Sequence, residues 1–151
     1  MRRLTLVLAL STVWIAALAL PAAADAVYHS GHIPFAPIGE APLRSGFVEN
    51  IHANGPNVFA HEQYVVNGAE PNTTYDVVLT ISIGDPTCTS PSFAMTTATI
   101  TTDAAGNGTA DHVFTPADAA GLRGLLLGGV WQLVEGGTPV YATGCEAVQL
   151  D

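Results

Sequence analysis

Five histidines are the residues of this sequence best suited to metal binding or to proton transfer near neutral pH. Four of them are candidate metal ligands: His29, His32, His52 and His61. The first two are separated by two residues in HSGHIPF, and the other two would face each other across a hairpin, with Glu49 or Glu62 nearby. A zinc or copper site needs more ligands than either pair supplies, held in a fixed geometry. We therefore expect no bound metal and no other cofactor.

Sequence motifs of common hydrolases are missing. The chain has no Gly-x-Ser-x-Gly segment and no His-Glu-x-x-His segment, which would mark a serine nucleophile or a catalytic zinc. Any two of its 13 acidic residues could still converge in space as an acid–base pair. We predict no catalytic residue and favour a protein that is not an enzyme.

The N-terminal segment has the pattern of a secretory signal peptide. Arg2 and Arg3 precede an apolar run, and small residues follow it, so cleavage is expected after Ala24 or after Ala26. An uncleaved membrane anchor is the alternative, but the run is short for a span of about 20 residues. Residues 1–24 are therefore excluded from the fold, and we predict a secreted, extracellular protein without stable membrane insertion.

The charge of the remaining chain narrows the choice of partners. Residues 25–151 keep all 13 acidic residues and only two cations, Arg44 and Arg123, which gives two minus 13, a formal charge of −11. Such a surface repels a phosphate backbone, so nucleic acid is not expected as a partner. The partner that we expect is an unidentified extracellular protein or glycan.

The clearest structural element is the segment 74–88, TYDVVLTISIGDPTC. Apolar side chains recur at every second position of 75–83, the pattern of a strand with one buried face. Gly84 and Pro86 end this strand, and Cys88 follows in the loop. We predict a core strand that is anchored covalently at its exit.

Further strands follow from alternation and from the turns between them. They are expected at residues 47–53, 58–66, 93–102, 108–114, 129–135 and 140–150, with a short helical turn at 115–121. In the strand 93–102, Thr97, Thr99 and Thr101 are expected on the wet face. The pattern predicts one all-β domain at 43–151, an antiparallel, immunoglobulin-like sandwich of seven or eight strands, preceded by an extended arm at 27–42.

The two cysteines, Cys88 and Cys145, are expected to pair, because an exported domain meets an oxidising environment. We expect their bond to run through the core beside Trp131 and Leu133. Asn72 and Asn107 begin tripeptides that fit the N-glycosylation pattern, which the sequence alone does not show to be used.

The segments GDPTCTSPSF and ATGCEAVQLD resemble copper-zinc superoxide dismutases, in which a strand leads into a Gly-Asp loop whose cysteine bonds one near the C-terminus. The resemblance covers about half of the mature chain and implies a sandwich and the bridge. It does not imply the chemistry, because residues 75–83 hold no histidine where that family has copper ligands, and none lies between Cys88 and Asp111.

The function that these patterns favour is a secreted, non-catalytic β-sandwich domain that acts in extracellular binding or scaffolding. Two alternatives stay open. One is a histidine-based metal-binding protein or metalloenzyme on a superoxide-dismutase-like sandwich, and the other is a secreted inhibitor.

Overall fold

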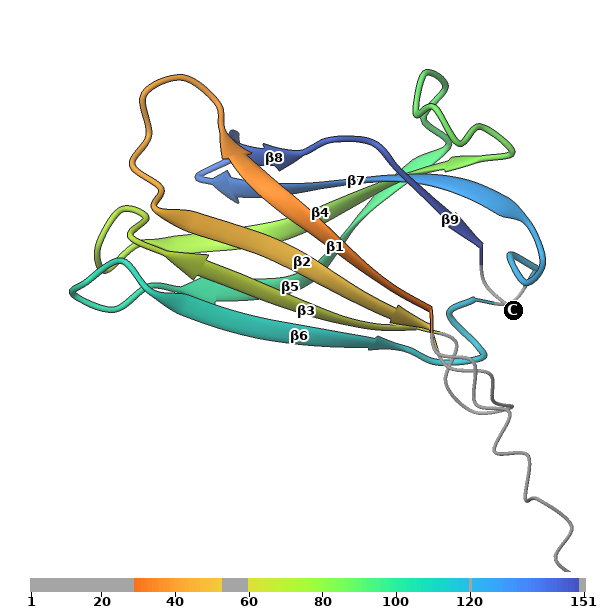
Figure 1. The fold of residues 1–151 in the computed structure, drawn as a ribbon, viewed down its shortest axis with the longest axis horizontal. Helices are drawn as coiled ribbons and strands as arrows, with labels where there is room; N and C mark the ends of the chain where they lie inside the picture. The colour runs from red at the N-terminus through yellow and green to blue at the C-terminus, as the bar shows by residue number, and fades with distance from the viewer. Residues whose placement is uncertain (1–28, 53–59, 120, 150–151) are drawn as a thin grey trace, which may run out of the picture.

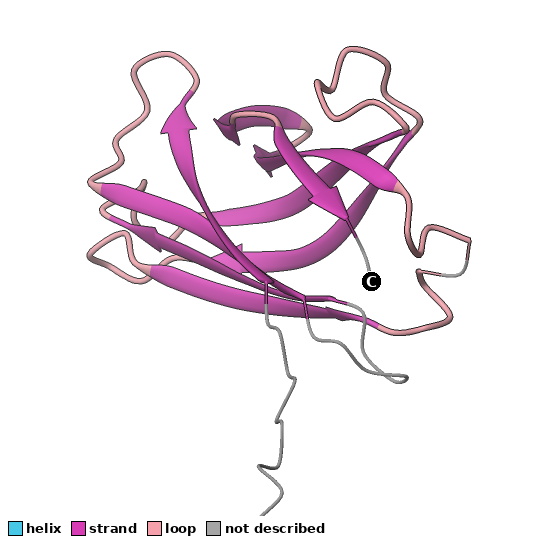
Figure 2. Ribbon diagram, turned by 45° about the vertical axis from the view of Figure 1, so that its right-hand side comes forward, coloured by secondary structure: helices cyan, strands magenta, loops and turns pink. Residues whose placement is uncertain are grey.

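A computed structural model describes residues 29–52, 60–119 and 121–149, and these form nine β-strands (Figure 1). The strands are β1 His29–Pro37, β2 Ser45–His52, β3 Ala60–Asn67, β4 Thr74–Ile83, β5 Phe93–Thr101, β6 Gly108–Phe114, β7 Leu126–Glu135, β8 Thr138–Thr143 and β9 Glu146–Gln149. Figure 2 shows strands and loops but no helix in this part of the chain. Among the described residues there is thus no helix that could span a membrane. The predicted signal segment, 1–24, lies outside them.

All nine strands belong to one antiparallel sheet with the order β5-β4-β7-β8-β1-β2-β3-β6, and β9 pairs with the first part of β7. The two end strands, β5 and β6, contact each other, although no ladder joins their described residues. The sheet therefore curls round until it is nearly closed (Figure 1). The predicted all-β, antiparallel class is therefore confirmed.

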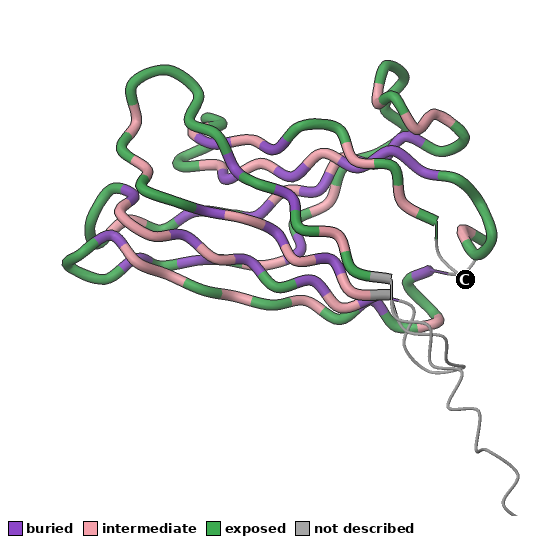
Figure 3. The backbone as a smooth tube through the Cα atoms, viewed as in Figure 1, coloured by how far each residue is buried: buried purple, intermediate pink, exposed green. Residues whose placement is uncertain are grey.

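The predicted core strand is confirmed as β4, which lies between β5 and β7. Tyr75, Val77, Leu79 and Ile81 are buried, whereas Ile83, the last residue of the alternation, is 43% exposed. Burial alternates in the same way along β3 and β7, so the buried faces line the inside of the curled sheet (Figure 3). The core is thus a single interior enclosed by one sheet.

Residues 29–37, expected within an extended arm, form β1 inside the sheet. Its first part pairs with β2 and its last three residues pair with β8. Ile33 and Phe35 are buried and alternate with exposed Pro34 and Ala36. The three prolines of 27–42 suggested an extended arm, and the alternation within it is that of a strand that changes partners halfway.

Two further features depart from the sequence prediction. The single strand expected at 140–150 is divided into β8 and β9 by Gly144 and Cys145, which both lie exposed between them. Thr97, expected on the wet face, is 8% exposed. The register of β4 and β5 shifts there, since Val77 pairs with Ala98 and Val78 with Thr96. Thr97 is the extra residue of a β-bulge, and a bulge turns a side chain away from simple alternation.

The disulfide between Cys88 and Cys145 is present, with an S–S distance of 2.05 Å. It does not run through the core beside Trp131, as the sequence predicted, because Cys145 is exposed and Cys88 is half-buried. A Cβ added at Gly128 would lie 2.8 Å from Cys88 Sγ, and one added at Gly129 would lie 2.8 Å from the Trp131 ring. Consecutive strand residues face opposite sides of a sheet. The bridge and Trp131 therefore lie on opposite faces of β7.

We expect reduction of this disulfide to lower the free energy of unfolding by about 2–5 kcal/mol, because the bond restricts the unfolded chain across a separation of 57 residues. Urea unfolding with and without reductant measures the loss, after mass spectrometry has confirmed the oxidised state. The double variant C88S/C145S should match the reduced protein and should not respond to reductant. Equal midpoints for oxidised and reduced protein would contradict this prediction.

Candidate functional site

The interior of the sheet contains a carboxyl group, that of Glu62. Burial in β3 alternates, with Ala60, Glu62, Tyr64 and Val66 turned inward. Glu62 is 1% exposed and is among the most deeply buried side chains of the described residues. Acidic side chains are rarely buried to this extent unless they have partners. Glu62 and the side chains that contact it therefore form a candidate functional site.

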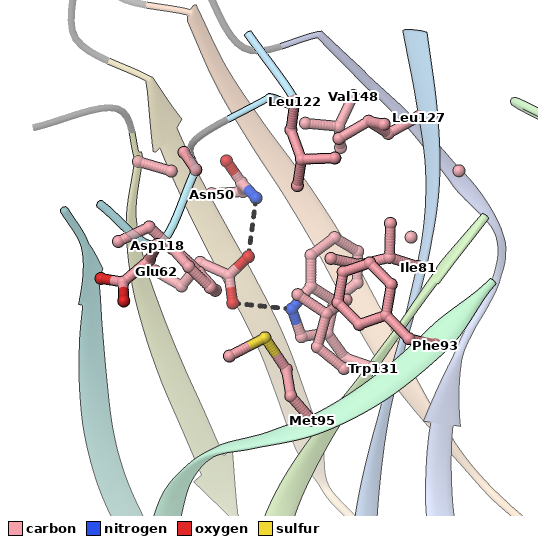
Figure 4. Close-up of a pocket in the computed structure, with 16 residues that line it drawn as sticks. Asn50, Glu62, Ile81, Phe93, Met95, Asp118, Leu122, Leu127, Trp131 and Val148 are labelled. Atoms are coloured by element: carbon pink, nitrogen blue, oxygen red, sulfur yellow. Dashed lines mark hydrogen bonds between the residues drawn. The ribbon is translucent and has the colours of Figure 1, made fainter. Parts of the chain in front are cut away.

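Three side chains from three strands donate hydrogen bonds to this carboxyl group. Asn50 Nδ2 on β2 donates to Oε1 over 2.9 Å, and Trp131 Nε1 on β7 donates to Oε2 over 2.8 Å (Figure 4). The Tyr64 hydroxyl lies 2.5 Å from Oε2. This donor set suits an ionised carboxylate, which only accepts hydrogen bonds.

The network continues from Tyr64 to β5. Its hydroxyl also lies 2.7 Å from Thr97 Oγ1, and Thr97 Oγ1 donates to the Val77 carbonyl oxygen over 3.3 Å. A phenol has one proton, so Tyr64 donates either to Glu62 or to Thr97 at a given time. The β-bulge is what brings Thr97 within reach, and the network thereby joins the two end regions of the sheet.

Burial raises the pKa of Glu62 from 4.5 to about 7, and the hydrogen bonds from Tyr64, Trp131 and Asn50 limit that rise. Burial and the neighbouring Glu62 also raise the pKa of Tyr64 far above its usual value. Tyr64 is thus a neutral donor at all ordinary pH values, whereas Glu62 changes its charge close to neutrality.

Glu62 and Asn50 lie at the polar end of a partly enclosed cavity of about 70 Å³ (Figure 4). The cavity occupies the end of the interior near β9 and the connection between β6 and β7. Its walls are largely apolar and include Leu79, Ile81, Phe93, Met95, Leu122 and Leu127. An apolar cavity with a few convergent polar groups is the usual form of a small-molecule site.

One buried polar atom at this site has no hydrogen-bond partner. Asn50 is 4% exposed, and while Nδ2 donates to Glu62, Oδ1 is unpaired among the described residues. Figure 4 shows this oxygen on the side of the amide that faces away from Glu62. An unpaired buried acceptor costs about 1–3 kcal/mol, so it calls for an explanation.

The predicted turn after β6 supplies another part of the cavity wall. The backbone N–H of Ala119 donates to the Thr115 carbonyl over 3.1 Å, which closes a single turn. Asp118 Oδ2 accepts from Thr115 N over 2.8 Å and from Thr115 Oγ1 over 2.7 Å. These bonds lower the pKa of Asp118. The turn thus places Ala119 and an ionised carboxylate, Asp118, along the lining.

The histidines predicted as metal candidates do not lie together at this site. His32 Nδ1 lies 2.9 Å from Glu49 Oε2, and His61 Nε2 lies 3.6 Å from Asp111 Oδ2, in two separate pairs. The Cα of His61 pairs with Ile51 and that of His52 pairs with His29, so His52 and His61 do not oppose each other. The sequence placed the register of this hairpin incorrectly by one residue.

The described residues contain no group of three or more histidine, cysteine or acidic side chains arranged to hold a metal ion. The structure describes the backbone of His29 and His52 but not their side chains. Metal binding by His29, His32, His52 and His61 therefore stays an alternative that the sequence leaves open.

Sequence reasoning missed the role of Glu62 and Asn50, although a signal was available. In the segment AHEQYVV, Glu62 shares its strand face with Ala60, Tyr64 and Val66, and so falls on the apolar side. Asn50 likewise shares a face with Val48. A charged or amide residue on the apolar face of a strand is the pattern that would have indicated a buried polar site.

We expect the stability of the protein to fall as the pH rises from about 4.5 to about 7. Folded Glu62 keeps its proton up to about pH 7 and unfolded Glu62 loses it near 4.5, so the folded state binds more protons in this window. The loss should be on the order of 3 kcal/mol and complete above pH 7.

Urea unfolding between pH 4 and pH 8 measures this slope. The variant E62Q, which cannot ionise, should remove it, whereas E70Q, at an exposed turn residue, should keep it. Asp85, Asp103 and Asp118 have lowered pKa values and act with the opposite sign below about pH 4. An unchanged slope in E62Q would contradict the assignment.

Comparison of the chain with protein-family models, with curated proteins and with solved structures found no match. The function is therefore argued from the cavity and from the residues that line it.

Proposed function

We propose that this is an exported binding protein whose interior cavity takes a small, largely apolar molecule that carries a hydrogen-bond donor. The observation that carries the proposal is the cavity itself, with apolar walls that end at a buried carboxyl group and at an unpaired amide oxygen, Asn50 Oδ1. A ligand with a donor group would pair this oxygen while its apolar part covers the walls.

The size of the cavity limits the ligand. At about 70 Å³ it is smaller than the cavity of roughly 150 Å³ that accommodates benzene in an engineered protein. It therefore suits a short alkyl chain or part of a ring, and the rest of the ligand would extend past Leu122 and Val148. Several ordered waters would also fit in this volume, and binding requires that a ligand displace them.

Export is part of the same proposal and is supported by the sequence pattern of residues 1–24 and by the Cys88–Cys145 bond. Structural disulfides persist mainly in oxidising compartments. The acidic surface is consistent with a soluble extracellular carrier or sensor of small molecules.

Within this proposal the curled sheet acts as a container for the ligand, as a barrel does, and the loops of a sandwich are not needed for binding. The sandwich form that the sequence predicted, with its resemblance to superoxide dismutases, remains the alternative description of the same strands. A secreted inhibitor and a histidine-based metal protein also stay predictions. Metal analysis of protein purified without an affinity tag tests the metal hypothesis.

We expect benzyl alcohol and 1-pentanol to change the fluorescence of Trp131, which lines the cavity and is the only tryptophan once residues 1–24 are removed. The change should saturate with concentration. The variant A119L fills the cavity from a buried position and should weaken binding at least about tenfold. The matched control A94L adds the same side chain at an exposed position of β5 and should bind as the parent protein does.

Two outcomes would overturn the proposal. One is the absence of a saturable change with either alcohol at millimolar concentration, and the other is equal affinity in A119L and A94L. Thermal unfolding of both variants shows whether they are folded.

A second candidate function is general acid–base catalysis, favoured by the pKa of about 7 that burial gives Glu62. A carboxylate at this place could remove a proton from the carbon beside a carbonyl group and return a deuteron from heavy water. Cyclopentanone in heavy water is a suitable probe, followed by NMR. Exchange that is faster with the parent protein than with E62Q would support catalysis, and equal rates would exclude it.

A further inference from the structure

We propose that the cavity selects small primary amines, bound as ammonium ions at Glu62 Oε1 with the apolar body of the ligand against the walls. The inference rests on the proposed binding function and names the chemical class of its ligand.

Two oxygens at the polar end of the cavity can each accept a further hydrogen bond. Glu62 Oε2 already accepts from Trp131 and Tyr64, whereas Oε1 accepts only from Asn50 Nδ2 over 2.9 Å. Asn50 Oδ1 has no partner among the described residues and lies on the side of the amide that faces away from Glu62 (Figure 4). An ammonium group carries three donors and no acceptor. One of its donors can therefore pair with Glu62 Oε1, and its charge offsets that of the carboxylate.

The groups that face Glu62 complement a cation. On β3 and β7 they are the neutral donors Tyr64 and Trp131, and on β2 the neutral amide of Asn50. His112 on β6 is opposite Glu62 in the strand register, and its ring packs on Phe114, 4.5 Å between ring centroids.

The interactions that favour the ionised form of Glu62 are hydrogen bonds from neutral groups, and its burial opposes that form. The turn after β6 places a second carboxylate, that of Asp118, at the edge of the cavity, where it is exposed and accepts hydrogen bonds from Thr115. An ammonium ion would supply the positive charge that offsets the desolvation of Glu62, since a buried charge is tolerated when it is paired and hydrogen-bonded.

Other ligand classes fit less well. An alcohol has one donor and no charge, so it cannot offset the charge of ionised Glu62. A carboxylate ligand would be repelled by Glu62 and Asp118. A guanidinium group offers five donors in a planar fork, more than two acceptors can satisfy inside a cavity of about 70 Å³.

Isothermal titration calorimetry with 1-pentylamine and 1-pentanol tests the inference, because the two probes have the same chain and differ in the polar group. At pH 8 the amine should bind about tenfold more tightly, since hydrogen bonds between charged groups are roughly twice as strong as neutral ones. Alkylamines stay protonated up to about pH 10, as lysine does. Because binding requires ionised Glu62, the amine affinity should fall up to about 100-fold from pH 8 to pH 5, and the pentanol affinity should not.

Proton release gives a second readout that needs no variant. At pH 6 most molecules of the free protein hold a proton on Glu62, so amine binding should release nearly one proton per ligand. Titrations in two buffers of different ionisation enthalpy measure this number. Pentanol binding should release none.

Two glutamine variants test whether the Glu62 carboxylate is the group that pairs with the ammonium ion. E62Q should lose both the preference for the amine and its dependence on pH, and thermal unfolding shows whether the variant is folded. E49Q removes a carboxylate from the same region of sheet, where Glu49 contacts His32, and should behave as the parent protein. If E62Q does not fold, the number of protons that the parent protein releases on amine binding tests the inference by itself.

The outcomes separate this inference from the proposed function. If pentanol binds and the amine binds no more tightly, releases no proton or keeps its preference in E62Q, the amine inference is wrong and the binding function stands. If neither probe binds, both are wrong.

Discussion

The burial of the Glu62 carboxyl group is the constraint on which the arrangement of this sheet depends. A carboxyl group taken out of water without partners would cost several kcal/mol, so its donors must be in place when the interior closes. Those donors come from β2, β3 and β7, and in the strand order β7 and β3 are separated by β8, β1 and β2. Trp131 reaches Glu62 only because the sheet curls. The hydrogen bond of 2.8 Å between them is therefore both the solvation of a buried acid and a contact across the closed interior.

The same network is consistent with either charge of Glu62. In the arrangement described here it receives three donors, as an ionised carboxylate requires. A proton on Oε1 would make this atom a donor, and a half-turn of the Asn50 amide would then bring Oδ1 toward it as the acceptor. Tyr64 can in turn donate to Thr97 in place of Glu62. The polar end of the cavity would thus present an acceptor when Glu62 is ionised and an amide N–H when it is neutral, which links ligand chemistry to pH.

The local alternation of apolar and polar residues made much of the fold predictable from the sequence. The other features depend on contacts between distant strands, which the sequence does not show. The strand from Thr74 to Ile83, the strand from Gly108 to Phe114 and the pairing of Cys88 with Cys145 follow from spacing, turn residues and compartment. The burial of Thr97 does not, because it depends on a bulge that only the partner strand reveals. The candidate site could not be predicted from local sequence either, because Glu62 is hydrogen-bonded to Trp131, which is 69 residues away in the chain. The position of the disulfide on the outer side of β7 likewise depends on how the sheet curls.

The cavity leaves part of the interior unfilled, and the free energy that this costs indicates that the cavity has a use. A volume of about 70 Å³ corresponds to about 2 kcal/mol at roughly 24 cal/mol per Å³, and the unpaired Asn50 oxygen adds about 1–3 kcal/mol. Their sum is close to what a disulfide that closes a long loop contributes, about 4 kcal/mol. One larger side chain at Ala60 or Ala119 would reduce the cavity, so a sequence under selection for stability alone has a short route to a better core. Exceptions to packing and to hydrogen bonding that coincide at one place are expected at functional sites. Here the cavity and one of the two unpaired buried atoms, Asn50 Oδ1, coincide beside the one deeply buried acid of the described interior, and that coincidence is the physical basis for regarding the cavity as a binding site.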